Sequence, residues 1–165
     1  DDEMELTNSV NNVNGRQKEV LFDKILRHFG DVNGMTFAIW GLAFKPNTDD
    51  VREAPARALI EALWNCGASV RVHDPQAMKS IEAIYGRLEK LVYCESPMDA
   101  ANNADALAIL TEWKVYHSPD LSSLFEALKK KVIFDGRNLF DPKLVSSFGL
   151  TYYSIGRPVA TALPE

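Results

Sequence analysis

The stretch GLAFKPNTDDVREAP, from Gly41 to Pro55, decides the fold. It follows the apolar run Thr36–Trp40 and leads into a helical pattern that Pro55 starts at its first position. A long loop between a strand and a helix is where ligands bind in an open α/β sheet. The loop carries Lys45 and Arg52, and two cations beside a helix N-terminus suit a phosphate or pyrophosphate.

The same loop lacks the fingerprint of a dinucleotide site. That fingerprint packs three glycines into a tight turn that opens directly into the helix. Here only Gly41 is present. The next strand-like run, Ser69–His73, does end at Asp74, the place of a ribose-binding acid, but an acid without the glycines is a weak signal. We therefore predict a Rossmann-like domain that binds another phosphorylated ligand with side chains.

Apolar runs alternate with helical patterns from residue 34 to residue 156, and this alternation predicts one α/β domain. The predicted strands are Thr36–Trp40, Ser69–His73, Leu91–Cys94, Ala106–Thr111, Lys131–Asp135 and Thr151–Ile155. The predicted helices are Pro55–Cys66, Gln76–Tyr85, Pro97–Asn103 capped by Ser96, Asp120–Lys129 and Pro142–Phe148. We expect a doubly wound, mostly parallel six-stranded sheet in the order 3-2-1-4-5-6.

Two terminal segments flank this domain. Residues 1–30 have an apolar face at 4-3 spacing and predict one long helix that ends at Gly30. A helix of that length exceeds the thickness of one sheet layer, so we expect part of it to pack outside this domain; an ordinary first helix along its own domain is the alternative. Residues 157–165 show no periodicity and are expected to be a loose tail.

A second candidate binding segment follows the fifth predicted strand, in Asp135-Gly136-Arg137-Asn138. The predicted strand order separates strands one and five by one neighbour, so Arg137 and Lys45 lie close enough to hold one ligand. A pairing of Arg137 with Asp135 or Asp141 is the structural alternative. Phe44, beside Lys45, either covers an apolar part of the ligand or packs into the core.

The Gly41–Pro55 stretch resembles the start of the C-terminal, nucleotide-sugar-binding domain of the UDP-glucose/GDP-mannose dehydrogenase family. Further stretches similar to this family follow in the same order across most of the chain: VNGRQK at 13–18, HDP at 73–75, TEWKVY at 111–116 and FDGRN at 134–138. The Pro after Lys45 and the TEW triplet resemble the UDP-glucose branch more than the GDP-mannose branch.

The resemblance implies that the chain is part of an NAD-dependent enzyme that oxidises UDP-glucose to UDP-glucuronate in two steps. Phe44, Lys45 and Arg137 would bind the UDP-sugar, and Arg52 would reach NAD held by a separate N-terminal domain. The family's GGxCxPKD nucleophile motif does not occur here, so no catalytic residue is assigned and the fragment is expected to be inactive. Residues 1–30 would belong to the central helix that links the two domains and forms a homodimer.

Composition excludes several other classes. The formal net charge is −5 without a basic stripe, which argues against a nucleic-acid partner. No apolar stretch reaches membrane-spanning length, and a cytoplasmic location is expected. Cys66 and Cys94 lack CxxC spacing and a nearby His cluster, so we expect buried structural thiols and no metal site.

Other functions stay open at this point. Related enzymes that oxidise UDP-N-acetyl sugars share the loop with Lys45 and Arg52, so these residues do not fix the sugar, and a GDP-mannose dehydrogenase fragment is a further alternative. Two alternatives come from other functional classes: a non-catalytic nucleotide-binding module, and a dimerisation module built on the N-terminal helix.

Overall fold

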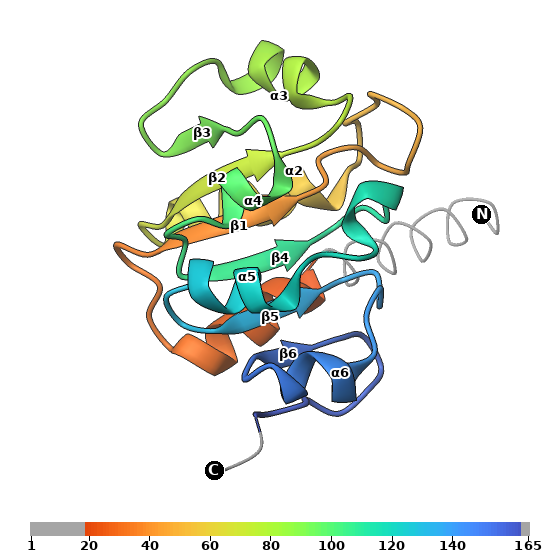
Figure 1. Ribbon diagram of the computed structural model, residues 1–165. Helices are drawn as coiled ribbons and strands as arrows, with labels where there is room; N and C mark the ends of the chain where they lie inside the picture. Colours follow the sequence, from red (N-terminus) through yellow and green to blue (C-terminus); the bar gives the residue numbers. More distant parts are fainter. Residues whose placement is uncertain (1–18, 163–165) are drawn as a thin grey trace, which may run out of the picture.

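A six-stranded parallel sheet forms the centre of the computed structural model, which describes residues 19–162 (Figure 1). Its strands lie in the order β3-β2-β1-β4-β5-β6, and each neighbouring pair is parallel. This arrangement confirms the predicted doubly wound sheet and its strand order. The strand bounds are β1 (Thr36–Trp40), β2 (Ser69–His73), β3 (Leu91–Tyr93), β4 (Ala106–Ile109), β5 (Val132–Asp135) and β6 (Thr151–Tyr153).

The helices connect successive strands, as predicted. They are α2 (Pro55–Asn65), α3 (Met78–Tyr85), α4 (Pro97–Ala101), α5 (Leu121–Ala127) and α6 (Pro142–Ser147), and a short 3₁₀ helix η1 (Lys114–Tyr116) follows β4. The hydroxyl of Ser96 accepts a hydrogen bond from the Asp99 amide and caps α4. The start of α3 lies two residues later than expected because the amides of Gln76 and Ala77 donate to the carboxylate of Asp74 instead.

Two helical layers enclose the sheet. In Figure 1, α4 and α5 lie in front of the sheet, and α2 and the helical segment 19–29 lie behind it. In that segment, Phe29 packs edge-on against Phe37 of β1 and tilted against Phe134 of β5. Strands β4 and β5 are buried along their whole length, which is typical of a parallel sheet covered on both faces.

The prediction for the N-terminal helix is tested only over its last part. The structure shows a helix at 19–29 and a turn at Gly30, where φ is +75°. The predicted helix over residues 1–18, and with it the linking and dimerisation role, lies outside the described residues. Among residues 19–162, no helix has the length and apolar character needed to cross a membrane.

The C-terminal segment differs from the expected loose tail. Ala160 forms two backbone hydrogen bonds with Tyr152 of β6, as an isolated antiparallel bridge. The side chain of Arg157 also donates to the hydroxyl of Ser154. The chain is therefore held against β6 as far as residue 160.

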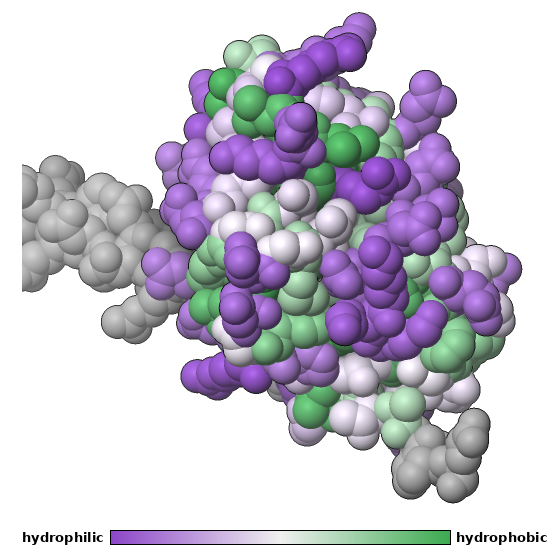
Figure 2. Space-filling view, turned by 90° about the vertical axis from the view of Figure 1, so that its left-hand side faces the viewer, coloured by the Kyte–Doolittle hydropathy of each residue, from purple (hydrophilic) through white to green (hydrophobic). Residues whose placement is uncertain are grey.

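The strands begin at one side of the sheet and end at the opposite side (Figure 1). The strand arrows point to the right in Figure 1, so Figure 2 views the amino-terminal edge of the sheet, which is mostly hydrophilic with scattered apolar residues. The carboxyl-terminal edge carries the loops after β1, β4 and β5. A cavity opens among these loops, and the candidate site is built there.

Candidate functional site

Strand register brings the ends of four strands to one level. Trp40 of β1 is level with His73 of β2 and with Ile109 of β4, and Ile109 is level with Asp135 of β5. The residues that follow these four positions therefore begin the loops of one shared rim. This places the β1–α2 loop and the loop after β5 on the same rim, as the sequence predicted.

The base of the β1–α2 loop is fixed by the buried carboxylate of Asp74. One oxygen accepts hydrogen bonds from the amides of Leu42 and Ala43, at 2.8 and 3.0 Å, and from the indole of Trp113 at 3.0 Å. The other accepts from the amides of Gln76 and Ala77, both at 2.8 Å. Asp74 thus joins three loops of the rim, which explains why a charged residue is fully buried here.

Gly41 allows the loop to leave β1 against the neighbouring strand. Its φ is +99°, and a Cβ at this position would lie 2.5 Å from the Cβ of Thr111 and 2.6 Å from its amide nitrogen. The hydroxyl of Thr111 in turn donates to the carbonyl of Ala43 at 2.7 Å. A side chain at residue 41 would separate these two segments, so the single glycine of the loop has a packing role.

The outer part of the loop is shaped by Asp50. The amide of Phe44 donates to the carbonyl of Asp50, and the carboxylate of Asp50 accepts from both the amide and the guanidinium of Arg52. These contacts with Arg52 lower the pKa of the Asp50 carboxyl. The side chain of Arg52 remains 87% exposed, so it points into solvent and is not a lining residue of the cavity.

The turn after β5 is fixed in a similar way. The buried carboxylate of Asp135 accepts from the amides of Arg137 and Leu139, each at 2.8 Å, and from the hydroxyl of Tyr152 at 2.6 Å. Burial, followed by these contacts with Asp135, raises the pKa of Tyr152. The side chain of Asn138 exchanges two hydrogen bonds with the backbone of Ile155. The backbone of Arg137 is thereby held between two anchored residues.

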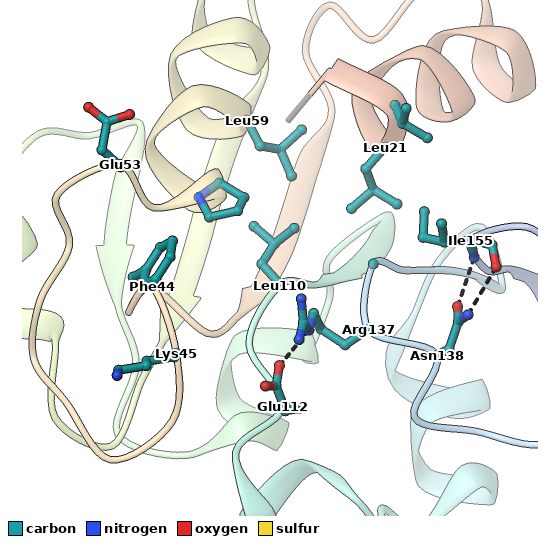
Figure 3. A pocket seen from close by; sticks show the side chains of 13 residues that line it. Leu21, Phe44, Lys45, Glu53, Leu59, Leu110, Glu112, Arg137, Asn138 and Ile155 are labelled. Atoms are coloured by element: carbon teal, nitrogen blue, oxygen red, sulfur yellow. Dashed lines mark hydrogen bonds and ion pairs between the residues drawn. The ribbon is translucent and has the colours of Figure 1, made fainter. Parts of the chain in front are cut away.

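A cavity of about 840 Å³ lies between these two loops and the helical segment 19–29. Figure 3 shows Phe44 and Lys45 on one side of it and Arg137 on the other. Leu21, Leu59 and Leu110 form apolar parts of the lining. Phe44 is 54% exposed, so its ring faces the cavity mouth and does not plug the core. The volume falls in the range of small-molecule sites, which combine apolar walls with a few polar groups.

Arg137 has a partner that sequence reasoning did not identify. Its guanidinium forms an ion pair through Nε with Glu112, and not with Asp135 or Asp141, the alternatives weighed from the sequence. Glu112 belongs to the TEWKVY stretch at 111–116, to which the sequence assigned no site residue. Trp113 is buried and bonds Asp74, so it supports the rim from behind. The available signal was that Glu112 directly follows the predicted strand end at Thr111 and lies three residues beyond Ile109, which is level with Asp135 of β5.

The described residues do not form a nicotinamide site or a metal site. Asp74 is fully buried and each of its oxygens is engaged, so it is not available to a ribose. Within residues 19–162, no three His, Cys, Asp or Glu side chains gather as metal ligands. Cys66 and Cys94 are free thiols; Cys94 is buried as expected, whereas Cys66 is only partly buried. Burial raises the pKa of Cys94, which disfavours a nucleophilic thiolate.

Comparison with known proteins agrees with this architecture. A family model described as the UDP binding domain of the UDP-glucose/GDP-mannose dehydrogenase family matches residues 38–142. A UDP-glucose 6-dehydrogenase of Pseudomonas aeruginosa is 44% identical over 151 residues, which cover 89% of this chain and 33% of that protein. The chain thus spans about a third of the length of the curated relatives it matches.

Solved structures give the same picture. A UDP-glucose dehydrogenase from Pyrobaculum islandicum matches with a TM-score of 0.71 and 33% identity, over 83% of this chain and 30% of that one. An NDP-N-acetyl-D-galactosaminuronic acid dehydrogenase from Methanosarcina mazei matches with a TM-score of 0.69 and 28% identity, over 85% of this chain and 28% of that one.

Proposed function

The chain belongs to the UDP-glucose/GDP-mannose dehydrogenase family and contains its UDP binding domain, and we propose that it holds the nucleotide sugar for an NAD-dependent UDP-glucose 6-dehydrogenase. The complete enzyme would oxidise UDP-glucose to UDP-glucuronate, and the reacting groups would come from sequence outside this chain. Binding energy at the nucleotide would then position a distant carbon for reaction.

One observation carries this proposal. Lys45 and Arg137 come from two different loops, yet they line one cavity at the carboxyl edge of the sheet, with Phe44 beside them. Two cations separated by an apolar, half-enclosed space suit a ligand with a pyrophosphate and a flat or apolar part. The loops are fixed from below by Asp74 and Asp135, so the backbone segments that carry the two cations are in place before any ligand binds.

Arg52 has a different place in the proposal. Its exposed side chain is oriented by Asp50 and lies outside the cavity lining, so it is suited to meet a group that another domain presents. We propose that this group is NAD, held by an N-terminal domain, since the described residues of this chain do not fit NAD. The linking and dimerisation role of residues 1–30, and a cytoplasmic location, belong to the same proposal.

The test is ligand binding by the chain itself. Lys45→Ala and Arg137→Ala should each weaken UDP-glucose and UDP binding about tenfold or more in calorimetric titration, since a charge-assisted hydrogen bond contributes ~1.5–3 kcal/mol. Arg87→Ala is a matched control, because Arg87 also pairs through Nε with an acid, Glu82, but lies outside the cavity lining. Unchanged affinity in both pocket variants would refute the site. UMP should bind more weakly than UDP.

The identity of the sugar is a separate question. A relative acting on an N-acetylated sugar has almost the same TM-score as the UDP-glucose enzyme, so the fold does not separate the two. We propose UDP-glucose because a relative that is 44% identical bears that name. Competition titrations with UDP-glucose, a UDP-N-acetyl sugar and GDP-mannose compare the three directly, and tighter binding of either alternative would replace UDP-glucose in the proposal.

A further inference from the structure

The charges in the cavity are balanced, which is unusual for a site that receives phosphates. Among the described lining residues, the cations are Lys45 and Arg137 and the acids are Glu53 and Glu112. Glu112 contacts Arg137, which is one of the residues proposed to bind phosphate: its carboxylate forms an ion pair with Nε of Arg137. An acid at this position weakens the field of Arg137, so its presence needs an explanation.

Glu112 is held in this place by both of its neighbours. Thr111 is buried and its hydroxyl donates to the carbonyl of Ala43 in the β1–α2 loop. Trp113 is buried and its indole donates to Asp74. The backbone on either side of Glu112 is therefore anchored, and the side chain is only one-third exposed. The anchored backbone keeps the carboxylate within side-chain reach of Arg137, so a ligand at Arg137 meets its charge.

The guanidinium of Arg137 still has donors for a ligand. The ion pair engages Nε, and a guanidinium has five N–H groups. Figure 3 shows Glu112 on one side of Arg137, with the head of the guanidinium extending toward Leu110 and the cavity. A phosphate bound there would share Arg137 with the negative charge of Glu112, which would reduce the binding energy gained from each additional ligand charge.

We infer that Glu112 is a specificity-determining residue that makes the cavity prefer nucleotide sugars to free nucleotides. This inference rests on the proposed function. In a nucleotide sugar one phosphate is esterified to the nucleoside and the other to the sugar, and an anhydride bond joins them. Each phosphate then carries one negative charge, about two in total. A terminal phosphate loses a further proton with a pKa of about 6, so at pH 8 UDP carries about three charges and UTP about four. Glu112 repels the additional charges.

Such a preference has a use in the cell. A free nucleoside diphosphate is what remains after a transfer reaction removes the sugar from a nucleotide sugar. It shares the base, the ribose and both phosphates with the substrate, so attraction by two cations alone would bind it at least as strongly. A fixed carboxylate beside Arg137 opposes occupation of the site by this sugarless form.

The experiment compares three ligands rather than one affinity. UDP-glucose, UDP and UTP are titrated calorimetrically at pH 8 and constant ionic strength, without divalent cations, into the unchanged chain and into Glu112→Gln. Glutamine keeps the size of the side chain and an acceptor oxygen for Arg137 but removes the charge. The affinity for UDP relative to UDP-glucose should rise about threefold, and that for UTP further, as Coulomb's law gives for unit charges about 7 Å apart in water.

Two further variants separate the charge effect from other causes. Glu82→Gln removes an equivalent acid that pairs with Nε of Arg87 outside the cavity lining, and the ligand ratios should stay at their original values. Glu112→Asp keeps the charge, so it should also keep the preference for UDP-glucose. Loss of the preference in this variant would contradict the inference, even if Glu112→Gln fails to fold.

Two kinds of result would overturn the inference. The first is a set of ligand ratios that do not change in Glu112→Gln: an equal gain for all three ligands would mean that Glu112 only competes for Arg137, and an equal loss would mean that it only holds Arg137 in position. The second is a change of the ratios that also occurs in Glu82→Gln, which would remove the charge effect. If the unchanged chain bound none of the three ligands, the proposed function would fail and the inference with it.

Discussion

Replacing Asp74 by Asn is expected to destabilise the fold far more than its single-atom change implies. The carboxylate accepts five hydrogen bonds, three at one oxygen and two at the other, and all five donors are N–H groups. An Asn side chain offers one acceptor oxygen, and its amide group is a further donor. In either orientation, at least two buried N–H groups therefore face another donor.

The structure gives the magnitude. The smaller loss places the amide group of Asn toward Gln76 and Ala77, whose two N–H groups then have no acceptor. A hydrogen bond to a charged group contributes about 1.5–3 kcal/mol, so two lost bonds cost about 3–6 kcal/mol. A domain's whole stability is usually about 5–15 kcal/mol, so Asp74→Asn should leave the chain close to unfolding at room temperature.

Urea unfolding followed by circular dichroism measures this loss. Asp105→Asn is the control, because Asp105 accepts one described hydrogen bond, from the amide of Thr36, which an amide oxygen can also accept. We expect the control to lose about 1 kcal/mol or less. If both variants lost the same free energy of unfolding, the assigned role of Asp74 as the anchor of three loops would be wrong.

Three other outcomes are expected. In the complete enzyme, Arg52→Ala should raise the Michaelis constant for NAD much more than that for UDP-glucose, because Arg52 is exposed outside the cavity; an equal rise in both would show that it only braces the loop. Cys66→Ser and Cys94→Ser should leave turnover intact, since burial raises the pKa of Cys94 and neither thiol lines the cavity; loss of turnover in a folded variant would contradict this. Burial lowers the pKa of His73, so the unfolded chain binds the proton more readily and stability should fall as the pH drops below about 6.5. His73→Asn should therefore reduce the change in urea midpoint between pH 7.5 and 5.5. A smaller change should remain, because burial also lowers the pKa of His28.

The sequence predicted those parts of the fold that depend on local pattern. The apolar runs Thr36–Trp40 and Ser69–His73 coincide with β1 and β2 residue for residue, because both are bounded by glycine or by a polar turn. The predicted end of β4 at Thr111 was two residues too long. Thr111 continues the apolar run, but its hydroxyl binds the β1–α2 loop, which ends its part in the sheet.

The contacts between loops could not be predicted in the same way. Lys45 and Arg137 were placed on one rim because that follows from strand order alone. The pairing of Arg137 with Glu112, and the five bonds of Asp74, depend on strand register and on which way each side chain leaves its loop. An Asp after a second strand is a familiar sign of ribose binding, yet here the side chain turns inward and serves the backbone.

The bridge between Ala160 and Tyr152 affects whether the sheet can be extended by a strand from another molecule. The last strand of a sheet exposes unpaired N–H and C=O groups, which can template the addition of a strand from another molecule. At β6, both outward groups of Tyr152 are already bonded to Ala160, and the opposite edge strand, β3, is only three residues long. Intermolecular sheet extension, and the aggregation that follows from it, is thereby disfavoured at both edge strands, β3 and β6. A chain shortened before Ala160 would lose this protection at β6 while keeping every residue of the cavity.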